Sequence, residues 1–164
     1  MFGLKSVYFY FVACQISLVK FLKKTYFLSR NYNKSLESKT PQQVYYNPNS
    51  FLLSIITSYR THSFKINDID PNIFWLDDKK KDVEQMHSFL WLSLIDRKTD
   101  HAKIKKIIYI WMLKNSKYKK KTWETSTLST RIISWILNVD IILDNSTFDF
   151  RRNFLNCIIS QTNH

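Results

Sequence analysis

Glycine and proline are nearly missing from this chain of 164 residues. Gly3 is its only glycine, and its three prolines are Pro41, Pro48 and Pro71. Tight turns, hairpins and kinks depend on these two residue types. Their scarcity favours helices joined by polar loops. It also excludes the phosphate-binding loops G-x-G-x-x-G and G-x-x-x-x-G-K-[ST], because one glycine at position 3 cannot form either.

Metal-binding and catalytic patterns are missing as well. Cys14 and Cys157 lie far apart with no C-x-x-C spacing, and no two of the four histidines stand four residues apart. We therefore expect no metal and no cofactor, and free thiols rather than a disulfide. His87 lies in the apolar segment QMHSFLWLSL, which favours a packing histidine over a general base. Carboxylates gather where helices are expected to begin, so capping explains them and no catalytic residue is assigned.

Acidic residues are few, with 13 Asp and Glu against 25 Lys and Arg, and the formal net charge is +12. Such an excess is typical of proteins that bind nucleic acid or another acidic polymer. The alternative is compositional, because lysine is abundant here together with Asn, Ile, Tyr and Phe. The segment KNSKYKKKTWE interleaves Tyr118 and Trp123 with lysines, as nucleic-acid-binding surfaces do. A solvated loop between helices is the favoured interpretation, and a nucleic-acid partner is not expected.

The longest apolar run is VYFYFVACQISLV, from Val7 to Val19, and it follows Lys5. It resembles the apolar region of a signal peptide. However, Gln15 and Ser17 interrupt it, KFLKK follows at once, and there is no A-x-A-like cleavage site. The run is also too short to span a membrane. We expect a helix packed on the body of the protein, with a degenerate signal peptide as the alternative, and the compartment stays open.

Hydrophobic spacing predicts an all-α protein. A helix over Phe2–Ser29 precedes a polar loop over Arg30–Ser50; residues 51–64 are a short helix or an extended segment, and 65–78 an irregular connection. Four further helices are expected. The first begins near Asp77 or Asp78, and the second runs from about Ala102 to Leu113. The third runs from about Thr127 to before Asn145, and the fourth starts at Ser146, where Asp149 completes a capping box. The last is still helical in pattern at the end of the sequence, as in the front part of a longer protein.

Trp123, Arg131 and Trp135 form the pattern Trp-x7-Arg-x3-Trp. On a helix, Arg131 and Trp135 are one turn apart, so the guanidinium can lie over the indole. In one interpretation Trp135 fills the core and the stem of Arg131 extends along it toward solvent. In the other, an indole supports a sugar ring and Arg131 binds the carboxylate or sulfate of that sugar.

Three segments resemble, in order, the N-terminal part of heparinase II/III-like proteins. In that family a helix with His, an aromatic residue and Trp-Leu precedes a helix ending in Trp, a Trp-x7-Arg-x3-Trp element, and a helix ending in Gln-x-x-His. The matching positions are Trp123, Arg131, Trp135, Gln161 and His164. The resemblance covers about residues 64 to 164. The segments are HSFLWLSLID, IYIWMLKNSKYKKKTWETSTLSTRIISWILN and FRRNFLNCIISQTNH.

This resemblance implies the N-terminal part of an α/α toroid built of antiparallel helix pairs. Residues 1–63 would be an N-terminal helix and polar lead-in, and residues 64–164 the first toroid helices. Further helices and a β-sandwich domain would follow. It also implies a lyase that cleaves uronic-acid-containing polysaccharides by β-elimination. The periplasm or cell envelope is the compartment that the resemblance suggests for such a lyase.

Trp123, Arg131, Trp135, Gln161 and His164 would then line the substrate groove or pair helices. The family's catalytic Asn, Tyr and His residues lie beyond the Gln-x-x-His element, so none is carried over and these 164 residues are expected to be inactive alone. Two alternatives stay open. One is a small basic helical module that binds nucleic acid or an anionic surface, and the other is a module that pairs its apolar faces with another chain.

Overall fold

The structure, a computed structural model, describes residues 3–37, 83–95 and 101–164. These residues form helices joined by turns, with no strand among them, so the all-α prediction is confirmed for the described part of the chain. The chain divides into two compact units, Met1–Ser35 and Leu36–His164. The expected boundary between residues 63 and 64, the segment 51–78 and the helix start at Asp77 or Asp78 lie outside the described residues.

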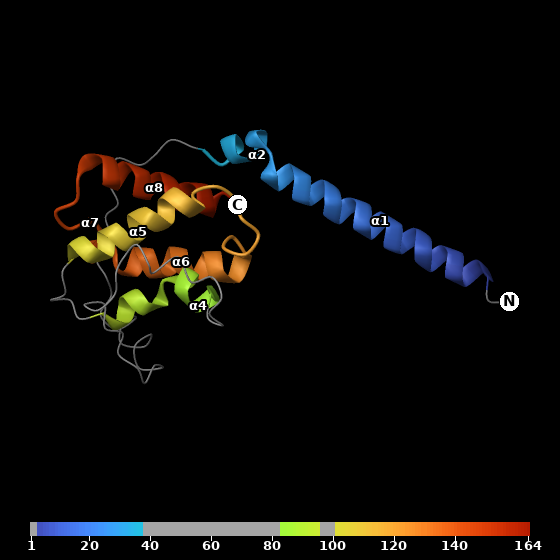
Figure 1. Cartoon of the computed structure of the whole chain (residues 1–164), viewed down its shortest axis with the longest axis horizontal. Helices are drawn as coiled ribbons and strands as arrows, with labels where there is room; N and C mark the ends of the chain where they lie inside the picture. The colour runs from blue at the N-terminus through green and yellow to red at the C-terminus, as the bar shows by residue number, and fades with distance from the viewer. Residues whose placement is uncertain (1–2, 38–82, 96–100) are drawn as a thin grey trace. The chain divides into compact units, whose positions relative to one another are not determined.

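The first unit consists of α1 (Gly3–Leu28) and α2 (Arg30–Ser35) (Figure 1). The helix predicted over Phe2–Ser29 is confirmed. The polar loop predicted from Arg30 is wrong for its first six residues, because Ser29 starts a second helix: its hydroxyl accepts a hydrogen bond from the Tyr32 N–H at 3.1 Å.

Helix α1 continues through the lysines that follow the apolar run. Its segment Ser6–Leu28 is therefore long and apolar enough, by length and composition, to cross a membrane. The sequence estimate was too short because it ended the segment at Val19. Most side chains of that segment are exposed within its own unit, and Val12 and Phe27 are partly buried.

The second unit contains six described elements. They are α4 (Val83–Ser88), the 3-10 helix η1 (Leu90–Leu94), α5 (His101–Asn115), α6 (Thr125–Leu137), α7 (Val139–Leu143) and α8 (Phe148–Thr162). Helix α6 lies against α4, η1 and α8, and α8 lies against α5. In Figure 1 the chain reverses its direction from α5 to α6 and again from α6 to α8.

Two of the predicted helices are interrupted. The helix predicted to begin near Asp77 or Asp78 does not continue past Ser88, because the chain turns at Phe89, which has a left-handed φ of 58°. Such a conformation is unfavourable for an aromatic residue, and complete burial of the Phe89 ring holds it. The helix predicted from Thr127 to before Asn145 breaks at Asn138, whose side-chain amide donates to the Ser134 carbonyl at 2.8 Å.

The start of α8 also corrects the sequence analysis. Thr147, not Ser146, is the N-cap, and its hydroxyl accepts a hydrogen bond from the Phe150 N–H at 3.3 Å. The Ser146 hydroxyl instead donates to the Leu143 carbonyl at 2.9 Å. The predicted capping box of Ser146 with Asp149 is therefore wrong, because Ser146 belongs to the preceding turn.

An aromatic cluster forms the centre of the second unit. Trp135 of α6 lies 5.1 Å from Phe89, 5.3 Å from Trp111 of α5 and 5.1 Å from Phe154 of α8, measured between ring centroids. The contacts with Phe89 and Trp111 are edge-to-face, which aromatic pairs favour. Trp135 is fully buried, so the interpretation that it fills the core between helices is confirmed.

Candidate functional site: a buried arginine

Arg131 lies at the middle of the candidate site and is 0% exposed. Its Nε donates a hydrogen bond to Gln161 Oε1 at 2.6 Å, and its Nη1 donates to the His87 carbonyl at 2.9 Å. These partners are 30 and 44 residues away in sequence. A single guanidinium therefore joins α4, α6 and α8.

Two indole rings enclose the Arg131 guanidinium. Its central carbon lies 5.9 Å from the ring centroid of Trp135, which confirms the predicted contact one helical turn away. It lies closer, at 4.4 Å, to the ring of Trp111 on α5. The sequence analysis missed this second ring, because no spacing along one helix can reveal a contact between two helices. The electron-rich ring faces partly offset the lost hydration of the cation.

No carboxylate pairs with Arg131 among the described residues, where the recorded ion pairs are His101 with Asp144 and Arg152 with Asp149. Its Nη2 is sealed from solvent without a hydrogen-bond partner. Burial lowers the pKa of Arg131 from its ordinary value to about 10, against a smaller raising effect of Cys157. Arg131 therefore lies in the interior and does not line a groove that is open to solvent. Neither does its stem extend toward solvent.

Gln161 links Arg131 to a cysteine. Its Oε1 accepts from Arg131, and its Nε2 donates to Cys157 Sγ at 3.0 Å, one turn back on α8. Cys157 is buried and Cys14 exposed, and both are free, as the sequence predicted. Burial raises the pKa of the Cys157 thiol from 9.0 to about 11, while Gln161 and Arg131 lower it to a lesser extent. The thiol is accordingly neutral at physiological pH.

His87 serves the same cluster and is 7% exposed. The Trp111 indole N–H donates to its Nδ1 at 2.8 Å, which assigns the second ring proton to Nε2. His87 is a buried, hydrogen-bonded packing histidine, as the sequence predicted. Its carbonyl, rather than its ring, contacts Arg131.

Trp123 and His164 form a separate corner of the site. Trp123 is 1% exposed, and its indole N–H donates to the Asn115 carbonyl at 2.9 Å. The exposed His164 places its ring 5.4 Å from the Trp123 ring and 5.3 Å from the Tyr118 ring. Partial burial lowers the pKa of His164, and a hydrogen bond with the Trp123 backbone opposes this. Of the five predicted residues, His164 is the one that solvent reaches.

The lysine-rich loop lies between α5 and α6. Lys119, Lys120 and Lys121 are exposed, whereas Trp123 is buried in the corner just described. Trp123 therefore cannot stack on a nucleic-acid base, and the pattern of interleaved aromatic residues has a packing explanation. A solvated loop between helices is what the structure contains.

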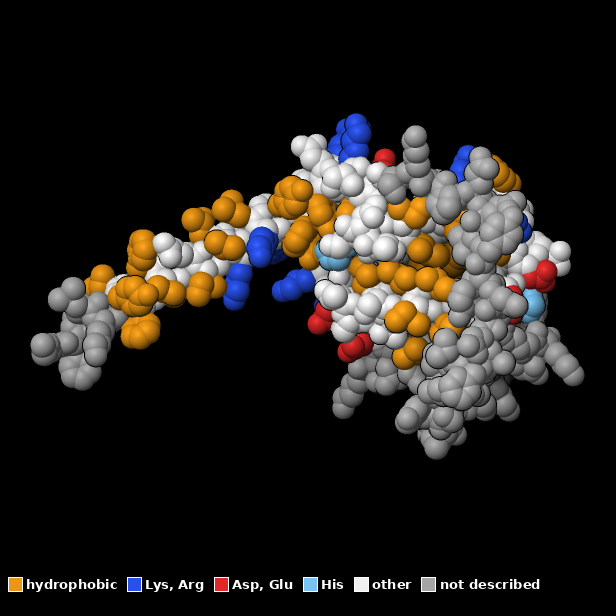
Figure 2. All heavy atoms as spheres, turned by 180° about the vertical axis from the view of Figure 1, so that it is seen from behind, with side chains coloured by type: hydrophobic (Ala, Val, Ile, Leu, Met, Phe, Trp, Pro, Cys, Tyr) orange, Lys and Arg blue, Asp and Glu red, His pale blue; other side chains and the backbone are white. Residues whose placement is uncertain are grey.

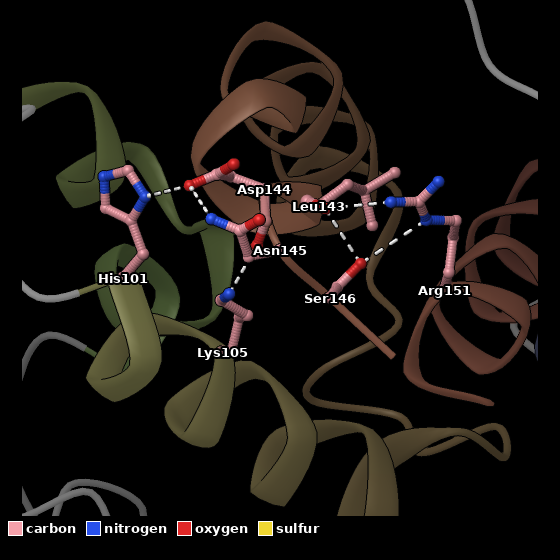
Figure 3. A network of polar contacts seen from close by, with 7 residues as sticks. All are labelled: His101, Lys105, Leu143, Asp144, Asn145, Ser146 and Arg151. Carbon is pink, nitrogen blue, oxygen red and sulfur yellow. Dashed lines mark hydrogen bonds and ion pairs between the residues drawn. The ribbon is translucent and has the colours of Figure 1, made fainter. Parts of the chain in front are cut away.

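A second polar network fastens the start of α5 to the turn between α7 and α8 (Figure 3). His101 Nδ1 lies 3.3 Å from Asp144 Oδ2, and Lys105 donates to the Asp144 carbonyl. On the other side of the turn, Arg151 donates to the Leu143 carbonyl at 3.2 Å and to the Ser146 hydroxyl at 3.4 Å. The bonds to the backbone carbonyls of Leu143 and Asp144 stabilise the turn, and the contact of His101 with the Asp144 side chain connects α5 to it.

Comparison with known proteins adds nothing to these contacts. No family model, curated protein or solved structure matches the chain. Within the described ranges, no group of three or more His, Cys, Asp or Glu residues is placed to hold a metal ion.

Proposed function

We propose that this chain forms part of the wall of an α/α toroid in a heparinase II/III-like polysaccharide lyase. One observation supports this above all: the residues that carry the resemblance pack together. Arg131 and Trp135 of α6 contact each other, and Arg131 is hydrogen-bonded to Gln161 of α8. An element that pairs helices requires these residue types in this order, because the guanidinium packs on the indole ring and the amide oxygen accepts its hydrogen bond.

The arrangement of the helices is consistent with such a wall. The chain reverses direction between α5 and α6 and between α6 and α8 (Figure 1). Tyr109 and Leu113, one turn apart on α5, and Ile133 on α6 remain exposed, and hydrophobic side chains reach the surface of this unit in Figure 2. In a toroid, neighbouring helices would cover such residues.

The proposed reaction is β-elimination on a uronic-acid-containing polysaccharide. It needs a base to remove the proton next to the uronate carboxylate, and donors that stabilise the charge developing there. Arg131, Trp135, Trp123 and Gln161 are buried and would support the helices, while the exposed His164 would be the one to approach the substrate. The base would come from residues beyond the Gln-x-x-His element.

The test is to read the coding sequence past the codon for His164 and to assay both polypeptides on uronate polysaccharides by the absorbance of unsaturated products. We expect no product from the 164 residues alone and product from the longer polypeptide. In the longer polypeptide, His164→Ala should raise KM without changing thermal stability, whereas Gln161→Ala should lower thermal stability. A stop codon directly after His164, or a longer polypeptide without lyase activity, would contradict the proposal.

A second candidate is binding of an anionic polymer by Lys119, Lys120 and Lys121, which are consecutive and exposed. Binding would be independent of base sequence, because phosphate contacts carry no sequence information. It should appear as a salt-sensitive gel shift that is lost when the three lysines are changed to Glu. Absence of a shift at low salt would exclude it.

A further inference from the structure

Helix α1 exposes apolar side chains around its whole circumference. Its five consecutive residues Val7, Tyr8, Phe9, Tyr10 and Phe11 are between 60% and 76% exposed. Successive residues of an α-helix are about 100° apart, so five in a row surround the axis. A helix that is hydrophobic on all sides belongs in a protein core or a membrane.

The described basic side chains of α1 share one face of the helix. Lys20, Lys23 and Lys24 are exposed and stand at positions i, i+3 and i+4, which share a face. Leu18 and Leu22, which are 58% and 55% exposed, point to the opposite face. Figure 2 shows the basic side chains of α1 gathered toward its α2 end and hydrophobic side chains over the rest of its visible surface.

Nothing in this unit neutralises the charge. Arg30 and Lys34 of α2 are also exposed, and the sequence has no Asp or Glu before Glu37. A surface with many negative charges would attract all five cations at once. Tyr8, Tyr10 and Tyr26 add rings with one polar end, which are favoured where water meets lipid.

We propose that α1 inserts into the surface of an anionic lipid bilayer, with Leu18 and Leu22 among the acyl chains and Lys20, Lys23 and Lys24 at the headgroup phosphates. This inference is independent of the proposed lyase function. A bilayer accounts for both features of α1, because its acyl chains accommodate apolar side chains and its headgroup phosphates attract the lysines.

The lysines also decide between lying in the interface and spanning the bilayer. The apolar segment Ser6–Leu28 has 23 residues, which is sufficient to span. However, Lys20 stands near its middle, and a spanning helix would place that ammonium close to the bilayer centre, where a charge is costly. A helix lying in the plane of the interface keeps its lysines in water.

The experiment is flotation of the full chain, made by cell-free synthesis, with vesicles of phosphatidylcholine alone or mixed with phosphatidylglycerol. We expect the chain to float with the anionic vesicles, less well at high salt, and to be released by alkaline carbonate. Changing Lys20, Lys23 and Lys24 to Glu should weaken binding by on the order of 100-fold or more, from the attraction of each lysine to an anionic surface. Leu18→Asp with Leu22→Asp should abolish it.

The matched control changes Lys119, Lys120 and Lys121 to Glu, which alters the net charge equally but leaves α1 intact. This variant should float like the unaltered chain. Tryptophan fluorescence reports the fold throughout, because every tryptophan follows α2 in sequence. Flotation requires no lyase activity, so its result tests membrane binding by α1 independently of the proposed lyase function.

Four outcomes would overturn the inference. The chain could stay at the bottom of the gradient with anionic vesicles, or the control variant could lose binding as strongly as the α1 variant. Resistance to carbonate would show a spanning helix instead. Recovery from cells of a chain that begins after α1 would show a cleaved signal sequence.

Discussion

Helices α1 and α6 lie in different units and reverse the usual relation between composition and burial. Most apolar side chains of α1 are exposed, whereas α6 buries three polar side chains, Thr127, Arg131 and Ser134, beside Leu128 and Trp135. Two of these side chains donate hydrogen bonds to other elements: the Ser134 hydroxyl donates to the Phe89 carbonyl at 2.6 Å, and Arg131 donates to two acceptors. Burial thus depends on neighbours that complement a side chain, and hydrophobic composition alone does not predict it.

The largest expected contrast is between a core tryptophan and an α1 aromatic residue. Trp135→Ala should lower the free energy of unfolding of the second unit by about 3–5 kcal/mol, because it leaves a cavity among three aromatic rings. Phe11→Ala should change it by less than about 0.5 kcal/mol, since Phe11 is 60% exposed. Urea denaturation followed by tryptophan fluorescence measures both. Equal effects of the two changes would break the comparison.

Replacement of Arg131 tests whether its hydrogen bonds outweigh the cost of burying its charge. Arg131→Ala should cost about 3 kcal/mol, because Gln161 Oε1 and the His87 carbonyl lose a charged donor. Arg131→Met should cost about 1 kcal/mol or less, since it retains volume without a desolvated cation. Chemical denaturation at neutral pH measures both, with Lys20→Ala of α1 as a control near zero. A methionine variant less stable than the alanine variant would contradict this balance.

The two cysteines extend the comparison to pH. The folded pKa of Cys157 is about 11 and its ordinary value 9.0, so between these values the unfolded chain gives up the proton that the folded chain keeps. The contribution of the protonated Cys157 thiol to the free energy of unfolding is fully present below about pH 9. It falls by roughly 2–3 kcal/mol as the pH rises toward 11.

The measurement is the unfolding free energy of the unaltered chain and of Cys157→Ala at several pH values between 9 and 11. The difference between the two proteins should shrink as the pH rises. Arg131 acts in the opposite direction above about pH 10, because burial lowers its folded pKa to about 10 and the unfolded chain keeps the proton to higher pH. The control substitution is Cys14→Ala, at an exposed position of α1. A flat difference for Cys157 would show that its thiol is not kept neutral by burial.

The smallest contrast concerns two threonines. Thr147 caps α8 through the Phe150 N–H, and Thr147→Ala should cost about 1 kcal/mol. The Thr25 hydroxyl donates to the Phe21 and Leu22 carbonyls within α1, where alanine has the higher helix propensity. Thr25→Ala should therefore leave the second unit unchanged and α1 as helical as before, as measured by denaturation and circular dichroism. A larger effect at Ser146 than at Thr147 would restore the capping box predicted from sequence.

Periodic spacing predicted most of the helices, because one amphipathic face is visible along a single segment. The helix of residues 101–115 and the pairing of Arg131 with Trp135 belong to this group. The break at Phe89 could not be predicted in this way, because burial of the Phe89 ring holds a conformation that an aromatic residue does not favour. The second helix after Ser29 was missed because the polar composition of its six residues resembles a loop.

The sequence by itself determined the helical class, the free thiols and the packing role of His87, since each follows from residue types and local spacing. Only the tertiary structure decided that Arg131 is buried between two indoles, hydrogen-bonded to Gln161 and a carbonyl of α4. The physical reason is that a buried cation is stable only where several helices supply rings and acceptors together, and no local pattern contains that information.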